Sequence, residues 1–264
     1  MSSLPRSSLK SLTKQSDTAR PAYLIAGLGG HVLKFRPLAR GIADAWHLTG
    51  VQYPVFAAGS AHCTSIENLC AEMSKPLENH EGPIVFLGYS IGGTIAYQMA
   101  TDLRQQGKDV AVVMIDTTVS VLRPKRGPMA LALQKIFLTW PRRLLGIKAR
   151  KSTLGRLPDE PVLRNFVDET IAAMDGYHPP KSAVPVVLIR ADSHRKWRRW
   201  INGPFWPSPT HGWARVAPVA GVVRCPGNHL TIVEPQNLEA LITAVHTALG
   251  IAYESLAGGR KNAA

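Results

Sequence analysis

Ser90 lies at the centre of the most informative pattern in this 264-residue chain. Residues 88–92 read GYSIG, which fits the pattern G-x-S-x-G. In that pattern a serine occupies a sharp turn between a strand and a helix. The apolar run 83–87 predicts the buried strand, and 92–106 predicts the helix, whose first N–H groups would point toward the serine. The pattern therefore predicts that Ser90 is a covalent nucleophile.

A serine nucleophile needs a neighbouring base, and His229 is the histidine that fits best. The chain order expected for this kind of site is serine, then acid, then histidine. Of the histidines after Ser90, His229 alone follows the last predicted strand and precedes the final helix, at the carboxyl end of the sheet. His246 falls inside that helix, whereas His194 and His211 belong to a loop rich in Trp and Arg.

Two aspartates are candidates for the acid that orients this base. Asp116 ends the apolar run VVMID, and Asp192 ends VVLIRAD one strand later. Both would lie at carboxyl ends of strands, where α/β proteins form their sites. Periodicity in the sequence does not separate the two.

The reaction also needs backbone N–H groups for the oxyanion. The N–H of Ile91, directly after the nucleophile, is one expected donor. The second should come from the glycine-rich loop 26–30 after the first strand. That loop lacks the full G-x-G-x-x-G pattern, so we do not expect it to bind a dinucleotide.

Strand-like and helix-like segments alternate along the rest of the chain. Apolar runs separated by helical periodicity predict an α/β fold with a mostly parallel central sheet and helices on both faces. The predicted strands are 22–26, 50–56, 83–87, 110–115, 184–189 and 219–224, and the predicted helices include 35–45, 65–78 and 236–249.

No strand is predicted between Asp116 and Val184. One helix is expected over 129–140, and a second begins near Asp159 and Pro161. We expect these helices to form a lid, over about 118–180, although they could instead pack as part of the main core. The apolar face of the second helix is formed by Leu163, Phe166, Val167, Ile171 and Met174.

Length and composition indicate one large domain, over 21–252, between flexible tails at 1–20 and 253–264. The leader is Ser-rich and basic but lacks the apolar stretch of a secretory signal. We find no transmembrane run. The three cysteines are too few and too scattered for a disulfide framework or a metal pair, so we expect free thiols in a cytoplasmic protein with no metal site.

The net charge of +13 is concentrated in one part of the chain. Residues 121–215 hold 18 Lys or Arg and 6 Asp or Glu, a net charge of +12. A basic surface of this kind attracts anionic partners. Basic and aromatic residues are interleaved over 195–200 (RKWRRW), a pattern that could bind nucleic acid, but a short loop beside a serine-nucleophile site favours another role.

Three segments resemble the thioesterase domains of nonribosomal peptide synthetases and polyketide synthases, which have the α/β-hydrolase fold. The segments are 27–39 (GLGGHVLKFRPLA), 88–117 (GYSIGG…MIDT) and 225–241 (CPGNHLTIVEPQNLEAL). The resemblance implies Ser90 as the acylated nucleophile and His229 as the base. It favours Asp116 over Asp192 as the acid, and Leu28 as the oxyanion donor beside Ile91.

The resemblance also implies a function: release of a peptide or polyketide acyl chain, by hydrolysis or cyclisation, from the phosphopantetheine arm of an acidic carrier protein. No cofactor of the enzyme's own is implied. We expect Tyr89, Trp197, Arg198 and Arg199 to contact the substrate or carrier. The alternatives are an esterase or lipase, an acyltransferase, and an inactive binding protein of the same fold.

Overall fold

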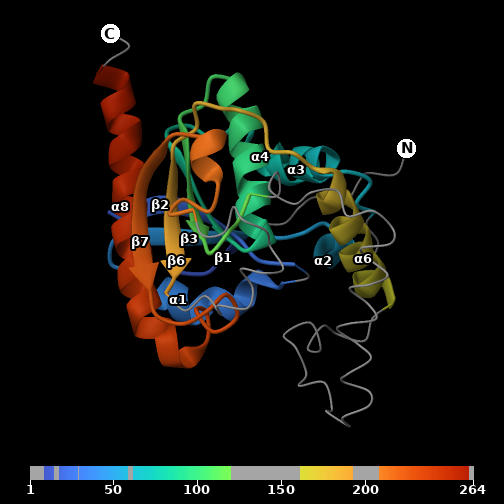
Figure 1. The fold of residues 1–264 in the computed structure, drawn as a ribbon, viewed down its shortest axis with the longest axis horizontal. Coiled ribbons are helices and arrows are strands. Elements are labelled where there is room, and N and C mark those ends of the chain that lie inside the picture. The colour runs from blue at the N-terminus through green and yellow to red at the C-terminus, as the bar shows by residue number, and fades with distance from the viewer. Residues whose placement is uncertain are drawn as a thin grey trace.

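The computed structural model describes residues 9–14, 18–28, 30–58, 62–119, 161–192 and 208–261. Its main elements are seven strands and the helices around them (Figure 1). The strands are β1 (Leu9–Ser11), β2 (Arg20–Ile25), β3 (Trp46–Val51), β4 (Ile84–Tyr89), β5 (Val110–Ile115), β6 (Val186–Ala191) and β7 (Val219–Cys225). The α-helices are α1 (Arg36–Gly41), α2 (Val55–Ala58), α3 (Ile66–Ser74), α4 (Ile91–Gln105), α6 (Pro161–Gly176) and α8 (Leu238–Lys261), with short 3-10 turns at Val32–Phe35, Lys75–Leu77, Trp213–Arg215 and Pro235–Asn237.

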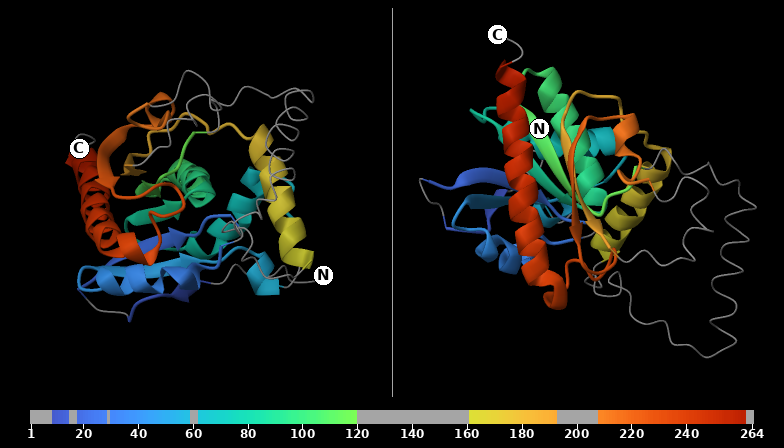
Figure 2. Two further views of the ribbon diagram at one scale, coloured as in Figure 1. Left: turned by 60° about the horizontal axis from the view of Figure 1, so that its bottom comes forward. Right: turned by 60° about the vertical axis from the view of Figure 1, so that its left-hand side comes forward.

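The strands form one sheet in the order β1-β3-β2-β4-β5-β6-β7, and every pair is parallel except β1 with β3. Strand β5 is buried along its whole length and alternates between two core layers. One layer lies under α3, α4 and α6, and the other lies under α1 and α8, on the opposite side of the sheet (Figure 2). The prediction of a mostly parallel sheet with helices on both faces is therefore confirmed.

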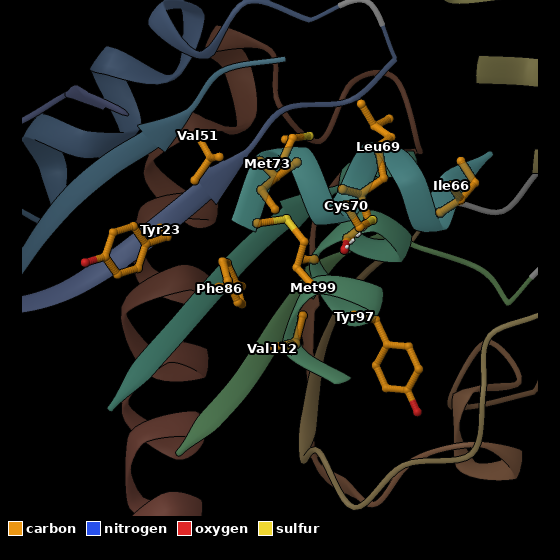
Figure 3. Close-up of a cluster of buried hydrophobic side chains, with 14 of the residues drawn as sticks. Tyr23, Val51, Ile66, Leu69, Cys70, Met73, Phe86, Tyr97, Met99 and Val112 are labelled. Atoms are coloured by element: carbon orange, nitrogen blue, oxygen red, sulfur yellow. Dashed lines mark hydrogen bonds between the residues drawn. The ribbon is translucent and has the colours of Figure 1, made fainter. Parts of the chain in front are cut away.

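The layer under α3 and α4 is built from large apolar side chains of both helices and the central strands. Figure 3 shows Met73 of α3 and Met99 of α4 above Phe86 and Val112 of the sheet. Cys70 lies in the same layer and its thiol donates to the carbonyl of Ile95 at 3.5 Å. This packing holds α4, and with it the turn that carries Ser90, against β4 and β5.

Both predicted tails contain ordered structure, which corrects the expected limits of the domain. Residues 9–11 form the edge strand β1, and Leu12 is buried, with its N–H donating to the carbonyl of Leu48 at 2.9 Å. Helix α8 continues through Gly250 as far as Lys261. Tyr253 on this extension packs edge-on against Trp46, and the Arg20 guanidinium lies over its ring. These contacts explain why the helix does not stop at its glycine.

Two other predicted boundaries were wrong. The strand expected at 50–56 is β3, which covers Trp46–Val51. Pro54 has no N–H to donate to a neighbouring strand, so the strand cannot continue through it. The helix expected at 35–45 is α1, which ends at Gly41.

By length and composition alone, Pro235–Ala257 would suffice to cross a membrane, with a mean hydropathy of 1.3. No transmembrane run was expected from the sequence, so this stretch is an addition to that expectation. Leu241, Val245, Leu249 and Ala252 lie in the core layer beneath α8. Packing on the sheet therefore accounts for the apolar character of the helix.

Helix α6 is the described part of the predicted lid. Leu163, Phe166 and Val167 are buried in the layer with α3 and α4, whereas Ile171, expected on the same face, is exposed. The Glu169 carboxylate accepts from the N–H of Cys63 at 2.8 Å. These contacts place α6 with the main core, which was the alternative to a lid. The helix expected over 129–140 lies outside the described residues.

Candidate active site

The turn between β4 and α4 holds Ser90 in a backbone conformation that serines seldom adopt, with φ 57° and ψ −125°. Its N–H donates to the carbonyl of Ile115 at 3.0 Å, which ties the turn to the end of β5. A left-handed non-glycine residue costs energy and persists where the surrounding structure enforces it. The strained turn predicted from G-x-S-x-G is therefore present.

Ser90, His229 and Asp116 form one hydrogen-bonded series. Ser90 Oγ lies 3.0 Å from His229 Nε2, and His229 Nδ1 lies 3.0 Å from Asp116 Oδ2. An ionised carboxylate can only accept, so the imidazole proton sits on Nδ1 and Nε2 is left to accept from the serine hydroxyl. The histidine thus has the tautomer that a general base for Ser90 requires.

The structure distinguishes the two candidate acids. Asp116 is buried, its backbone is left-handed at φ 46°, and its Oδ1 accepts from the N–H of Ala191 at 3.1 Å. Asp192 instead pairs with Arg224 at 2.6 Å on the surface. Asp116 is thus joined to His229, and the alternative acid Asp192 is not part of the series.

The Asp116 carboxylate is held in its charged form. Burial acts to raise the pKa of this carboxyl, but the hydrogen bonds from His229 and Ala191, together with the electrostatic influence of His211 and His229, outweigh it. The net pKa is lower than the usual value. A carboxylate that stays ionised can orient the imidazole and stabilise its cation.

Tyr89 supports the histidine, and its expected contact with the substrate stays a prediction. Its hydroxyl donates to the carbonyl of His229 at 2.6 Å, and the two rings stack with centroids 5.6 Å apart at 24°. The phenol ring is largely buried, and the ring of Phe35 packs edge-on against it. The sequence did not show this, because the loop that carries His229 is far from Tyr89 along the chain.

We predict that Tyr89→Phe lowers kcat about three- to tenfold. The variant keeps the ring stacking but loses one hydrogen bond to the loop, worth about 1 kcal/mol. The measurement is kcat and KM beside the melting temperature. Tyr97→Phe is the matched control, because Tyr97 also donates to backbone carbonyls, those of Pro180 and Val216, away from the series. An equal loss of kcat in both variants would contradict the positioning role of Tyr89.

The two expected oxyanion donors lie on neighbouring segments. Ile91 is the first residue of α4, so its N–H has no acceptor within the helix. A Cβ at Gly92 would collide with the carbonyl oxygens of Ile25 and Ala26, so the end of β2 lies directly against the start of α4. Leu28 follows that end and packs, partly buried, on the core layer that also contacts Ile91.

The remaining candidate residues from the sequence are exposed or lie outside the described part of the chain. Trp197, Arg198 and Arg199 lie outside the described residues, as does His194. His178 and His246 are exposed. Within the part of the chain that the structure describes, no group of three His, Cys, Asp or Glu side chains is placed to hold a metal ion.

Comparisons with known proteins agree with the fold. The family model described as "Thioesterase domain" matches residues 22–249. Enterobactin synthase component F of Escherichia coli O157:H7 is 34% identical over 91 residues, which are 33% of this chain and 7% of that protein. The chain thus spans less than a tenth of the length of this curated relative.

Solved structures show the same fold. The NocB thioesterase domain from the nocardicin cluster superposes with a TM-score of 0.63 at 22% identity, over 88% of this chain and 95% of that one. The four-domain nonribosomal peptide synthetase AB3403 superposes with a TM-score of 0.66 at 21% identity, over 90% of this chain but 20% of that one. The α/β-hydrolase fold expected from the sequence is confirmed.

Proposed function

The chain belongs to the thioesterase domain family, and on that premise we propose that it releases a peptide or polyketide acyl chain from a carrier protein through an acyl-Ser90 intermediate. The observation that carries this proposal is the series Ser90 Oγ–His229 Nε2 and His229 Nδ1–Asp116 Oδ2, each step 3.0 Å long. Two such hydrogen bonds in this order are what a serine nucleophile needs to be activated.

The proposed acylation step uses each member of the series once. Ser90 Oγ forms a bond to the thioester carbonyl carbon, while its proton passes to His229 Nε2. The C–S bond then breaks, and the thiol of the carrier arm leaves with the proton from His229. Asp116 keeps the imidazole oriented and stabilises its cation, and the N–H groups of Leu28 and Ile91 hold the oxyanion.

The second step frees the acyl chain. Water, or an amine or hydroxyl of the acyl chain itself, gives a proton to His229 and attacks the ester carbonyl. The Ser90–acyl bond then breaks and Oγ recovers a proton. Water gives a free acid, whereas an internal nucleophile gives a ring.

The proposed reaction requires no cofactor bound by the enzyme, because the phosphopantetheine arm arrives as part of the substrate. Every proton is moved by side chains of the chain. We also propose a cytoplasmic location, which is supported by the three buried free thiols Cys63, Cys70 and Cys225.

The relatives are parts of larger synthetases, and we propose that the partner here is an acidic carrier protein. The support is the concentration of positive charge over 121–215, since opposite charges accelerate and orient docking. Arg198 and Arg199 are the expected contact residues. The described residues of this basic stretch include the cations Arg164, Lys181 and Arg215.

We predict that salt weakens the reaction with the carrier-bound thioester but not with the free acyl-pantetheine. Raising the salt from about 0.05 to 0.5 M shortens the range of surface electrostatics several-fold. KM for the carrier-bound substrate should rise about tenfold, and Arg198→Glu with Arg199→Glu should have a similar effect. Equal salt dependence for both substrates would argue against electrostatic docking.

The function itself is tested by a matched set of substrates. One acyl chain is offered as the carrier-bound thioester, the acyl-pantetheine thioester and a soluble oxoester, and intact-protein mass spectrometry follows the acyl adduct. The proposal expects an adduct from the thioesters and free acid or ring as product. Turnover of the oxoester alone would favour an esterase. Transfer of the acyl group to an added acceptor would favour an acyltransferase, and the absence of an adduct from all three substrates would favour a binding protein.

A further inference from the structure

His211 shares a rare backbone conformation with two members of the proposed active site. Among the residues that the structure describes, the non-glycine residues with positive φ are Ser90, Asp116 and His211, at 57°, 46° and 48°. The proposed reaction uses the first two and assigns nothing to the third. His211 is 3% exposed, so its conformation is imposed by the interior. Such strain is concentrated at functional sites, which directs attention to what His211 contacts.

The imidazole of His211 lies between Arg190 and the backbone of Thr117. Arg190 Nε donates to His211 Nε2 at 3.0 Å, and Arg190 also donates to the carbonyl of Pro209 at 3.0 Å. A guanidinium can only donate, so Nε2 must accept and the ring proton sits on Nδ1. Nδ1 lies 3.3 Å from the Thr117 carbonyl oxygen, to which it can therefore donate. Arg190 thus selects the tautomer that binds Thr117.

Thr117 connects this histidine to both Asp116 and Ser90. It directly follows Asp116, and its carbonyl also accepts from Trp213 Nε1 at 3.0 Å. Its hydroxyl donates to the carbonyl of Ser90 at 2.9 Å. A Cβ at residue 93 would collide with the Thr117 side chain, so the glycine there makes room for this contact.

The segment after Asp116 is therefore held by hydrogen bonds at more than one residue. In addition to the bonds at Thr117, the N–H of Val119 donates to the carbonyl of His211 at 3.1 Å. The backbone of Asp116 itself is fixed by its N–H, which donates to Ile189 at 2.7 Å. This left-handed turn is the conformation in which the carboxylate meets His229.

We propose that His211, oriented by Arg190, is a positioning residue for the acid of the active site. It holds the Thr117 carbonyl and so keeps Asp116 in the conformation that directs its carboxylate at His229. The inference deepens the proposed function, because it assigns a supporting role within the same site. It requires no contact between His211 and the substrate.

The first test is His211→Gly, which removes the imidazole while a glycine accepts φ 48° without strain. We expect kcat for an acyl-pantetheine thioester to fall about 10- to 100-fold with KM unchanged, since small displacements of a catalytic group cost up to about 100-fold. Labelling of Ser90 by a fluorophosphonate should slow by a similar factor. Added imidazole should restore part of both rates.

The second test is Arg190→Gln, with Arg224→Gln as its control. Arg224 is the neighbour of Arg190 on β7 and pairs with the exposed Asp192. We expect Arg190→Gln to lower kcat about tenfold and Arg224→Gln to leave it unchanged. The double variant Arg190→Gln/His211→Gly should be no slower than His211→Gly alone, because the two residues act in one chain of contacts.

The outcomes separate this inference from the proposed function. If the His211 and Arg190 variants lose melting temperature but keep kcat and the labelling rate within twofold, the positioning role is wrong. If the wild type reacts with the fluorophosphonate but with no thioester, the proposed function fails, while the labelling rates still test His211. If His211→Gly fails to fold, the kcat and the labelling rate of Arg190→Gln alone test the positioning role.

Discussion

Ser90→Ala is expected to abolish the acyl adduct and to lower kcat/KM for an acyl-pantetheine thioester by at least about 10⁴-fold. Removing the nucleophile of a serine hydrolase leaves only what the oxyanion donors and substrate binding contribute. Replacing Ser90 by alanine removes no packing contact of the core, so the melting temperature should change little. The measurement combines intact-protein mass spectrometry with steady-state rates.

A matched variant separates loss of the nucleophile from loss of the site. Ser90→Cys keeps a nucleophile at the same turn, 3.0 Å from His229 in the parent protein. It should form a thioester adduct that is released slowly, whereas Ser90→Ala should form none. An adduct of equal mass on Ser90→Ala would show that another residue is acylated and would overturn the assignment.

The second large effect is expected from Asp116→Asn, which should lower kcat about 10⁴-fold with little change in KM. The amide presents an N–H where the carboxylate accepted, so His229 is driven to the other tautomer and loses its ability to accept from Ser90. The magnitude is that of the corresponding aspartate-to-asparagine change in a serine protease triad. The measurement is kcat for the acyl-pantetheine thioester together with the rate of fluorophosphonate labelling.

Asp192→Asn is the matched control for that experiment, because it makes the same chemical change at the end of the neighbouring strand. Asp192 pairs with Arg224 at the surface, and such pairs contribute little to stability. We expect activity within twofold of the wild type. A large loss in Asp192→Asn and a small one in Asp116→Asn would exchange the roles of the two acids.

The order of strands and helices could be predicted from the sequence because it depends on local patterns. The runs 83–87 and 110–115 are apolar without alternation, which is typical of strands buried on both faces. The ends of the domain could not be predicted in this way. Residues 9–11 have little apolar character, and they form a strand only because the edge of β3 accepts them.

The residues of the site likewise fall into those that local sequence patterns mark and those that they do not. Ser90 and His229 were predictable because each is marked by local signals: the glycines of residues 88–92 for the serine, and the place after the last strand for the histidine. The resemblance to the thioesterase family favoured Asp116 as the acid, but periodicity in the sequence did not distinguish Asp116 from Asp192. The positioning role of Tyr89 was missed, since no local pattern reports a contact across 140 positions of the chain.

The sequence by itself thus determined the fold class, the nucleophile and the base, because these follow from periodicity and chain order. Only the tertiary structure decided which aspartate meets His229. Both aspartates end strands at the same edge, but one carboxylate is turned inward by a left-handed backbone and an N–H from Ala191, and the other outward to Arg224. That choice depends on the packing of residues distant in the chain, among them Arg190 and His211, which no local pattern encodes.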